Sequence, residues 1–237
     1  MSKYLTKLNL IIVSAIVVVA VSFITYQLIN SSWRMDQQIL KRLGDNKEWL
    51  GQYKELKEKI KKNEEKGSKD PAALISLGFA WKGLGDATKD DYFLQQALKI
   101  YQQGISQFGS QNVIFYWSAG SVANGLGEFE MAEKYYKSAI AVAPVYGEGY
   151  TYLAELYRFK MKKIPDEIIK VYNNGLKATE GNMQLLLEKS SYLRAIGRYE
   201  ESLSGYKDLL EQYPNNKGFK DVILELEEKL KKGSPIN

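Results

Sequence analysis

Apolar side chains follow three different patterns along the 237 residues of the chain. Residues 8–29 form a nearly continuous apolar run, and residues 8–33 contain no charged side chain. Between Trp49 and Ile60 apolar residues recur every three or four positions, which is the spacing of one face of a helix. From Leu74 onward, apolar, alanine and glycine positions recur in longer blocks. We therefore expect a membrane-spanning segment, an amphipathic helix and a repeat region, in that order.

The repeat is clearest between Tyr116 and Pro144, where small residues alternate with tyrosines. The series consists of Tyr116, Ala119, Gly120, Ala123, Gly127, Ala132, Tyr136, Ala139 and Pro144. Partial copies precede and follow it, and one tyrosine in each copy marks a spacing of 35, 36 and 34 residues: Tyr101, Tyr136, Tyr172 and Tyr206. One helical hairpin cannot bury its own apolar face, so a fixed period of this length indicates hairpins stacked in series.

This pattern resembles the tetratricopeptide repeat (TPR), a helix–turn–helix unit of about 34 residues. The resemblance implies an all-α fold, in which a right-handed α–α superhelix, or TPR-like solenoid, contains four repeats over residues 70–215. The amphipathic segment 216–232 is expected to form a C-terminal capping helix, followed by a disordered tail at residues 233–237. Asp70 and Pro71 suit the cap and first turn of the first repeat helix.

The first repeat is longer than the others. From Leu74 to Tyr116 the step is 42 residues, and we expect the extra residues, near Asp86–Asp91, to lengthen the turn of the first hairpin. Residues 83–85 read Gly-Leu-Gly, which begins like a phosphate-binding loop but does not continue to a third glycine. Both glycines are therefore interpreted as turn and helix-capping residues.

The third and fourth repeats also depart from the pattern. The third repeat lacks the turn glycine, and residues 160–163 are expected to form a loop instead. In the fourth repeat Lys189 and Ser190 replace the Leu-Gly pair, which leaves the spacing of its two helices open.

The N-terminal apolar run predicts a single transmembrane helix over residues 8–30, after a basic tail at residues 1–7. The 22 residues from Leu8 to Ile29 span roughly 33 Å as a helix, enough for a hydrocarbon core of about 30 Å. The alternative is a removable secretory signal, but the run exceeds the roughly 7 to 15 residues typical of a signal core. A short basic tail before such a run is typical of a bacterial signal anchor. It predicts a single-pass protein of the bacterial cell membrane with extracytoplasmic repeats, although the flanking positive charges do not decide the orientation.

Residues 31–69 form a charged, helix-favouring linker. Its apolar stripe is expected to cap the first repeat, and the alternative is a short coiled coil, which usually needs three to four heptads. The lysines of this segment are interleaved with glutamates. We interpret them as a solvated helix face, with contact to anionic lipid or nucleic acid as the alternative.

Composition excludes several kinds of chemistry. The chain has no cysteine and no histidine, which removes thiol nucleophiles, serine–histidine triads and the usual zinc ligands. Lys and Arg exceed Asp and Glu by 12 to 7 in residues 1–67, but the counts are 21 and 21 in residues 68–237. Nucleic-acid binding needs clustered positive charge on the contacting surface. We therefore expect no enzyme, no catalytic residue, no metal site, no cofactor and no nucleic-acid partner.

The TPR resemblance also implies a binding surface, because in that family the first helix of each hairpin lines the concave side. The positions that it implies are Ala72, Ile75, Phe79, Lys82, Ile114, Trp117, Ser121, Asn124, Glu148, Thr151, Glu155, Arg158, Gln184, Leu187, Ser191 and Arg194. Phe79 and Trp117 are candidate anchors for a partner, and the alternative is that both rings pack inward as core. Arg158 and Arg194 are suited to a partner carboxylate, or else to surface ion pairs with Glu155 or Glu188.

The resemblance implies a membrane-anchored adaptor or scaffold that binds a protein or peptide partner in its groove. The alternative is a structural role, in which the repeats form a homo-oligomer and hold a membrane complex together. Family members that bind chaperone tails use a clamp of Lys, Asn and Arg. Ile75 and Phe79 in the leading repeat depart from that clamp, so this ligand class is disfavoured.

Overall fold

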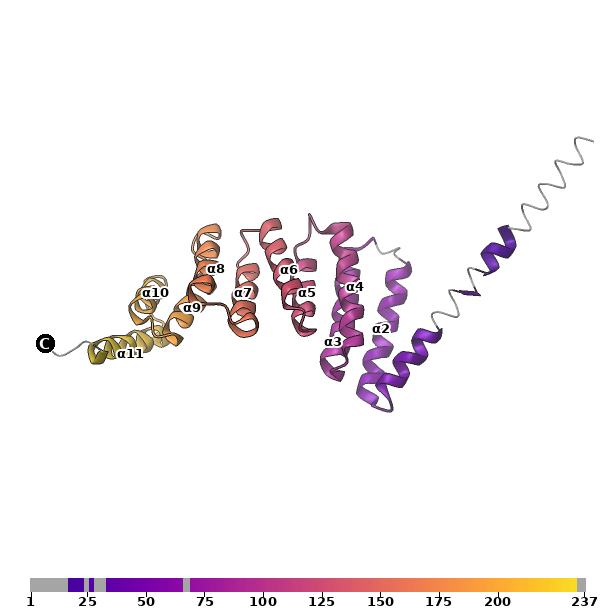
Figure 1. The fold of residues 1–237 in the computed structure, drawn as a ribbon, viewed down its shortest axis with the longest axis horizontal. Helices are drawn as coiled ribbons and strands as arrows, with labels where there is room; N and C mark the ends of the chain where they lie inside the picture. Colours follow the sequence, from indigo (N-terminus) through magenta and orange to yellow (C-terminus); the bar gives the residue numbers. More distant parts are fainter. Residues whose placement is uncertain (1–16, 24–25, 28–32, 66–68, 234–237) are drawn as a thin grey trace, which may run out of the picture. The chain divides into compact units, whose positions relative to one another are not determined.

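The structure is a computed structural model that describes residues 17–23, 26–27, 33–65 and 69–233 (Figure 1). Within these ranges every regular element is a helix, which confirms the all-α fold. The chain divides into two compact units, Met1–Lys54 and Glu55–Asn237, and the boundary falls inside helix α2 (Lys47–Glu65). The second unit contains the repeat region.

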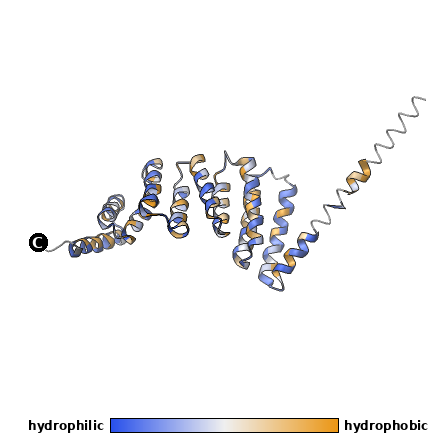
Figure 2. Cartoon of the chain, viewed as in Figure 1, coloured by the Kyte–Doolittle hydropathy of each residue, from blue (hydrophilic) through white to orange (hydrophobic). Residues whose placement is uncertain are grey.

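The first unit contains helical residues 17–23, 26–27 and 33–43 ahead of α2. Residues 17–23 are exposed and largely apolar, as the hydropathy colours of Figure 2 show. The expected transmembrane helix at residues 8–30 lies largely outside the described residues, and so does the basic tail. Among the helices that the structure describes, none is both long enough and apolar enough to cross a membrane.

Helix α2 starts at an asparagine cap and presents the expected apolar stripe. The side-chain oxygen of Asn46 accepts hydrogen bonds from two backbone amides of the first turn, at 3.0 and 3.1 Å. In the stripe, Tyr53 and Leu56 are buried. Within the second unit, Lys59 Nζ donates to Ser76 Oγ at 2.7 Å, which places the C-terminal half of α2 against the first hairpin.

Helical hairpins follow one another in series through the second unit (Figure 1). Their helices are α3 (Pro71–Thr88) with α4 (Asp91–Phe108), α5 (Ile114–Gly125) with α6 (Phe129–Val142), α7 (Glu148–Glu155) and its π-helical extension η1 (Leu156–Met161) with α8 (Pro165–Ala178), and α9 (Met183–Ala195) with α10 (Tyr199–Gln212). Helix α11 (Lys217–Gly233) packs against α10. The second helix of each hairpin also packs against the first helix of the next, so buried side chains from α5 to α9 form one continuous core cluster.

Small residues allow the two helices of a hairpin to approach closely. A Cβ atom added at Gly78 on α3 would lie 2.4 Å from the ring of Tyr101 on α4. In the next hairpin, a Cβ atom at Gly120 would lie equally close, 2.4 Å, to the ring of Tyr136. Both tyrosines are buried, with 0% and 3% of their surface exposed. In these two hairpins, the periodic tyrosine is therefore the large side chain that fills the space above a glycine.

The extra residues of the first repeat lengthen its helices. Helices α3 and α4 have 18 residues each, against 12 and 14 for α5 and α6, and only Lys89 and Asp90 separate α3 from α4. The prediction of a longer turn is therefore wrong. Gly83 and Gly85 accordingly lie inside α3, so their interpretation as turn glycines is also wrong. Gly85 is small for a packing reason, because an added Cβ atom would lie 2.6 Å from the side chain of Leu94.

The third hairpin turns without a glycine. Helix α7 widens into η1, which includes Lys160 and Met161, and the turn closes at Lys162 with a left-handed φ of 50°. Only the second half of the expected loop at residues 160–163 is therefore loop. A single-turn π-helix accommodates an extra residue inside a helix, and here it extends α7 into the segment where a loop was expected.

The fourth hairpin places its small residue on the second helix. Ser190 on α9 is 1% exposed, and a Cβ atom added at Gly205 on α10 would lie 2.1 Å from Ser190 Oγ. The polar atoms of this contact are satisfied, since Ser190 Oγ donates to the carbonyl of Leu186 at 2.7 Å and Ser202 Oγ donates to the carbonyl of Ser190 at 2.8 Å. Close packing is therefore kept although the Leu-Gly pair is missing.

Candidate binding surface

The sixteen positions implied by the TPR resemblance all lie on the first helices of the hairpins or, for Arg158, in η1. None of them is buried, whereas residues between them such as Leu74, Leu77, Leu153 and Leu185 are at most 4% exposed. We call the sixteen positions the first-helix face. The structure thus separates core from surface along these helices as the sequence pattern predicts, and partner binding at the face stays a prediction.

Phe79 is a large apolar side chain that remains outside the core. It is 53% exposed, and its ring meets the ring of Tyr101 edge-on with the centroids 6.2 Å apart. Nearby, Lys82 forms an ion pair with Asp86 at 2.6 Å, so its charge is matched within α3. The alternative that Phe79 packs inward as core is wrong.

Trp117 lies in a row of aromatic rings that joins the second and third hairpins. Its ring meets Tyr146 at 6.1 Å and Tyr152 at 6.4 Å, both edge-on, and Tyr152 lies 5.6 Å from Tyr136. We call these four residues the aromatic strip. Trp117 is half-buried, while Tyr146 and Tyr152 are 53% and 37% exposed. Within the described part of the chain, the Trp117 indole nitrogen is buried without a hydrogen-bond partner.

Beside the aromatic strip is a hollow of about 170 Å³ between the third and fourth hairpins. It is lined by Gly147, Glu148, Thr151, Tyr152, Asn182, Gln184 and Glu188. Thr151 Oγ1 and Gln184 Nε2 each donate to one carboxylate oxygen of Glu188, and both distances are 2.9 Å. The Glu188 carboxylate is therefore held in position at the wall of the hollow.

Negative charge gathers around Tyr152. Burial raises the pKa of the Tyr152 hydroxyl, and the carboxylates of Glu148 and Glu155 raise it further. The pKa of Glu155 is raised by burial and by the charge of Glu188, against the opposing effect of Arg158. Carboxylates of two successive hairpins therefore influence one another across this surface. No set of acidic side chains in the described residues is arranged to hold a metal ion.

The two arginines of the first-helix face are engaged by their own chain. The guanidinium carbon of Arg158 lies 4.7 Å from the ring centre of Phe159 and 5.1 Å from that of Tyr192. Arg194 forms an ion pair with Glu225 on α11 at 3.3 Å. Arg194 thus pairs with a residue that the sequence did not suggest. The position of Arg158 follows from aromatic contacts that the repeat pattern does not encode.

Several solved structures have the same arrangement of helices. One is a tetratricopeptide repeat protein from Parabacteroides merdae, with a TM-score of 0.54 and 18% identity over 83% of this chain and 73% of that one. Another is a thermophilic TPR protein from Thermus thermophilus, with a TM-score of 0.50 and 21% identity over 80% of this chain and 97% of that one. A third is YrrB, described as a TPR protein with an unusual peptide-binding site, with a TM-score of 0.50 and 16% identity over 74% and 85%.

The fold is a TPR-like solenoid. No family model and no curated protein matches the sequence. Identities this low show the fold alone, so the function of the solenoid has to be argued from its own side chains.

The repeat pattern does not assign Tyr152 or Glu188 to the binding surface, although the sequence suggests Glu188 as an ion-pair partner of an arginine. Tyr152 and Glu188 follow Thr151 and Leu187 directly, so they occupy equivalent positions in successive hairpins of the solenoid. The family pattern assigns that position to neither the core nor the ligand side. The sequence does show that Tyr152 is aromatic and that Glu188, one repeat later, is acidic, and this pairing could have indicated a binding site.

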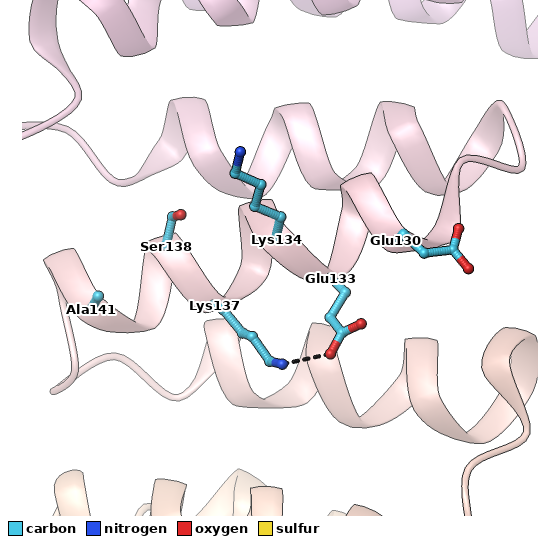
Figure 3. Close-up of a pocket in the computed structure, with 6 residues that line it drawn as sticks. All are labelled: Glu130, Glu133, Lys134, Lys137, Ser138 and Ala141. Atoms are coloured by element: carbon cyan, nitrogen blue, oxygen red, sulfur yellow. Dashed lines mark hydrogen bonds and ion pairs between the residues drawn. The ribbon is translucent and has the colours of Figure 1, made fainter.

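A second hollow of the solenoid, of about 410 Å³, runs along α6 (Figure 3). Two of its charged groups are matched, because Lys137 Nζ lies 2.5 Å from Glu133 Oε1, and Tyr157 also donates to that oxygen at 2.6 Å. Burial acts to raise the pKa of Glu133, but these two hydrogen bonds, together with the charges of Lys137 and Lys163, outweigh it and the pKa is lowered. We interpret the cluster as structural, since it ties α6 to η1.

Proposed function

We propose that this chain is an adaptor whose solenoid binds a protein or peptide partner on the first-helix face. The main support is the exposure of large aromatic side chains there. Phe79 is 53% exposed, and Tyr146 and Tyr152 of the aromatic strip are exposed next to Trp117, with Tyr152 also lining a hollow. Aromatic side chains that are accessible next to a concave site are the usual anchors of protein interfaces. The similarity to YrrB, a TPR protein with a peptide-binding site, agrees with this proposal.

We also propose that residues 8–30 anchor the solenoid in a membrane, with the repeats outside the cytoplasm. Support comes from the uncharged apolar run in the sequence and from the helical, apolar character of residues 17–23. Tethering raises the effective concentration for any partner at the same membrane, so that micromolar affinity suffices for capture. Protease treatment of inside-out membrane vesicles tests the orientation. The repeats should be protected there, since they would lie in the vesicle interior, and their digestion would contradict the proposed side.

Site-specific photo-crosslinking tests the adaptor proposal. A photoreactive amino acid at Ser121, an exposed position on α5, is expected to cross-link the partner in cells, whereas the same amino acid at Lys134 on α6 is not. Trp117→Ala and Phe79→Ala should each reduce this capture, since truncating an interface anchor costs at least about 2 kcal/mol, or about 30-fold in affinity. Met131→Ala is the matched control, because it removes a 38% exposed apolar side chain from a second helix.

The outcomes separate the adaptor from a structural scaffold. Circular dichroism must show unchanged helicity in each variant. If neither aromatic substitution reduces capture, the adaptor proposal is wrong. If the cross-linked product is a second copy of the chain, self-assembly is supported instead, and light scattering of the full chain in detergent should then show a size that grows with concentration.

A further inference from the structure

We propose that the partner segment presents a lysine or arginine side chain, flanked by apolar residues, to the first-helix face of the third and fourth hairpins. The cation would lie between the carboxylates of Glu155 and Glu188, with its aliphatic stem against Tyr152 and Trp117. This inference rests on the adaptor proposal and adds the chemistry of the partner.

Acidic side chains of the first-helix face are confined to the third and fourth hairpins. The implied positions on α3 and α5 carry no acidic residue, and Lys82 there is matched by Asp86. On α7 and α9 the face carries Glu148, Glu155 and the neighbouring Glu188. This end of the face also carries Arg158 and Arg194, so it differs from the apolar end in the charged ligands that it can attract.

In the described part of the chain, neither Glu155 nor Glu188 forms an ion pair with Arg158 or Arg194. The guanidinium group of Arg158 lies over the rings of Phe159 and Tyr192. The guanidinium group of Arg194 forms an ion pair with Glu225. Glu188 is oriented by two neutral donors, Thr151 and Gln184, which fix its position without cancelling its charge. The charge of Arg158 opposes part of the rise in the pKa of Glu155, and a ligand cation would balance the negative charge that remains on Glu155 and Glu188.

The aromatic strip suits the aliphatic part of a cationic side chain. Lysine and arginine bury their methylene groups against apolar surface while the charged head stays with acidic groups. Tyr152 joins the two features, since it lines the hollow, contacts Trp117 at 6.4 Å and lies under the influence of Glu148 and Glu155. The faces of tyrosine and tryptophan rings attract cations in addition.

A metal ion and an acidic peptide fit this surface less well. In the described residues no acidic cluster has the arrangement that a metal ion needs. An acidic peptide would meet Glu155 and Glu188, whereas the two arginines able to bind its carboxylates are already engaged. The chemistry of the surface therefore favours an organic cation on a peptide.

Fluorescence anisotropy with the full-length chain in detergent micelles tests this inference. The probe is a fluorescein-labelled peptide in which lysine and leucine alternate, and its matched controls carry acetyl-lysine or glutamate in place of lysine. The lysine peptide should bind at least about 10-fold more tightly than the acetyl-lysine peptide, since acetylation removes the charge and keeps most of the side chain. Its affinity should fall as salt is added.

Substitutions in the chain test whether the lysine peptide binds at Glu155 and Glu188. Glu155→Gln together with Glu188→Gln should weaken binding of the lysine peptide by at least about 10-fold, while glutamine at both positions keeps hydrogen-bonding capacity. Glu211→Gln removes one exposed carboxylate from α10, away from the face, and should change binding by less than about 2-fold. The single variant Glu155→Gln leaves the hydrogen bonds of Glu188 intact, so weaker binding in this variant cannot be attributed to their loss. Circular dichroism checks that each variant is folded.

Failure of this inference is distinguishable from failure of the adaptor proposal. Equal binding of the lysine and acetyl-lysine peptides, or unchanged binding in the double variant, overturns the cation site. In that case cross-linking from Ser121 that still depends on Trp117 leaves the adaptor proposal standing. If the wild-type chain associates with itself and the double variant does not, its own lysine-rich segment is the occupant and the inference of a separate partner is wrong.

Discussion

Two glycines on the same helix should respond in opposite ways to the same substitution. Gly78 and Gly83 both lie inside α3, so each change to alanine brings the same gain in helix propensity, up to about 1 kcal/mol. At Gly83 an added Cβ atom meets nothing within 4 Å, and Gly83→Ala should stabilise the protein by this amount. At Gly78 the same atom lies 2.4, 2.6 and 3.0 Å from three ring atoms of Tyr101.

The magnitude of the clash follows from how little room Tyr101 has to move. Its side chain is 0% exposed, and its ring also contacts Phe79, so it cannot swing out to solvent without leaving the core. Inserting a methyl group into a packed core typically costs about 1 to 3 kcal/mol. Because the propensity gain is common to both variants, the difference between Gly83→Ala and Gly78→Ala isolates this cost. We expect the difference to be about 1 to 3 kcal/mol.

Urea unfolding followed by circular dichroism measures this difference. Each variant is compared with the wild-type chain, and the shift in the unfolding midpoint gives the change in the free energy of unfolding when the slope is unchanged. For a protein of this size, about 1 kcal/mol corresponds to roughly 2 to 4 °C in melting temperature. Equal midpoints for the two variants, or a stabilising Gly78→Ala, would refute close packing between α3 and α4.

Two further predictions concern the third hairpin. Lys162→Gly should stabilise the protein by up to about 1 kcal/mol in thermal unfolding, because a glycine adopts the left-handed φ of 50° without strain; the same change at Lys160, inside η1, should destabilise it. Glu133 has a lowered pKa in the folded protein, so its contribution to stability is complete above its ordinary pKa of 4.5 and is lost as the pH falls below that value. Glu133→Gln should therefore flatten the dependence of the urea midpoint on pH between about 5 and 3, and a profile as steep as that of the wild-type chain would contradict the role given to this carboxylate.

The sequence predicts the solenoid because its main signal is a repeated contact. Tyrosines recur every 34 to 36 residues, and in the first two hairpins the tyrosine lies opposite a glycine of the first helix, so the same packing solution is used twice. Such a signal survives low overall identity, because it depends on side-chain volume at a few positions. The fold was therefore accessible from the residues alone.

The sequence did not reveal that the extra residues of the first repeat lengthen its two helices. Extra residues in a repeat can enter a loop or extend both helices, and the pattern of α3 and α4 fits either. The outcome depends on tertiary packing, in this case the contact of Gly85 with Leu94, which continues the helix pair beyond its usual length. Gly85, which looks like a turn glycine in the sequence, makes a close contact in the structure, whereas a Cβ atom at Gly83 would meet nothing within 4 Å.

The sequence predicted where the candidate surface lies but not all of the residues that form it. Every implied position is accessible, yet the residues that give the surface its character include Tyr146, Tyr152 and Glu188, which the repeat pattern does not assign. The same holds for the ion pair of Arg194 with Glu225, since α11 lies outside the repeats. Sequence periodicity defines which way a side chain faces, and contacts between repeats decide what it meets.

The exchange of small and larger residues between α9 and α10 bears on how this chain can diverge. In the first two hairpins the glycine is on the leading helix, whereas in the fourth Gly205 on the trailing helix faces Ser190. What must be preserved is the summed volume of the two opposed side chains, and either helix can contribute the smaller one. Homologous chains should accordingly change at such positions in compensating pairs, and a glycine lost from one helix should be matched by a reduction directly across from it.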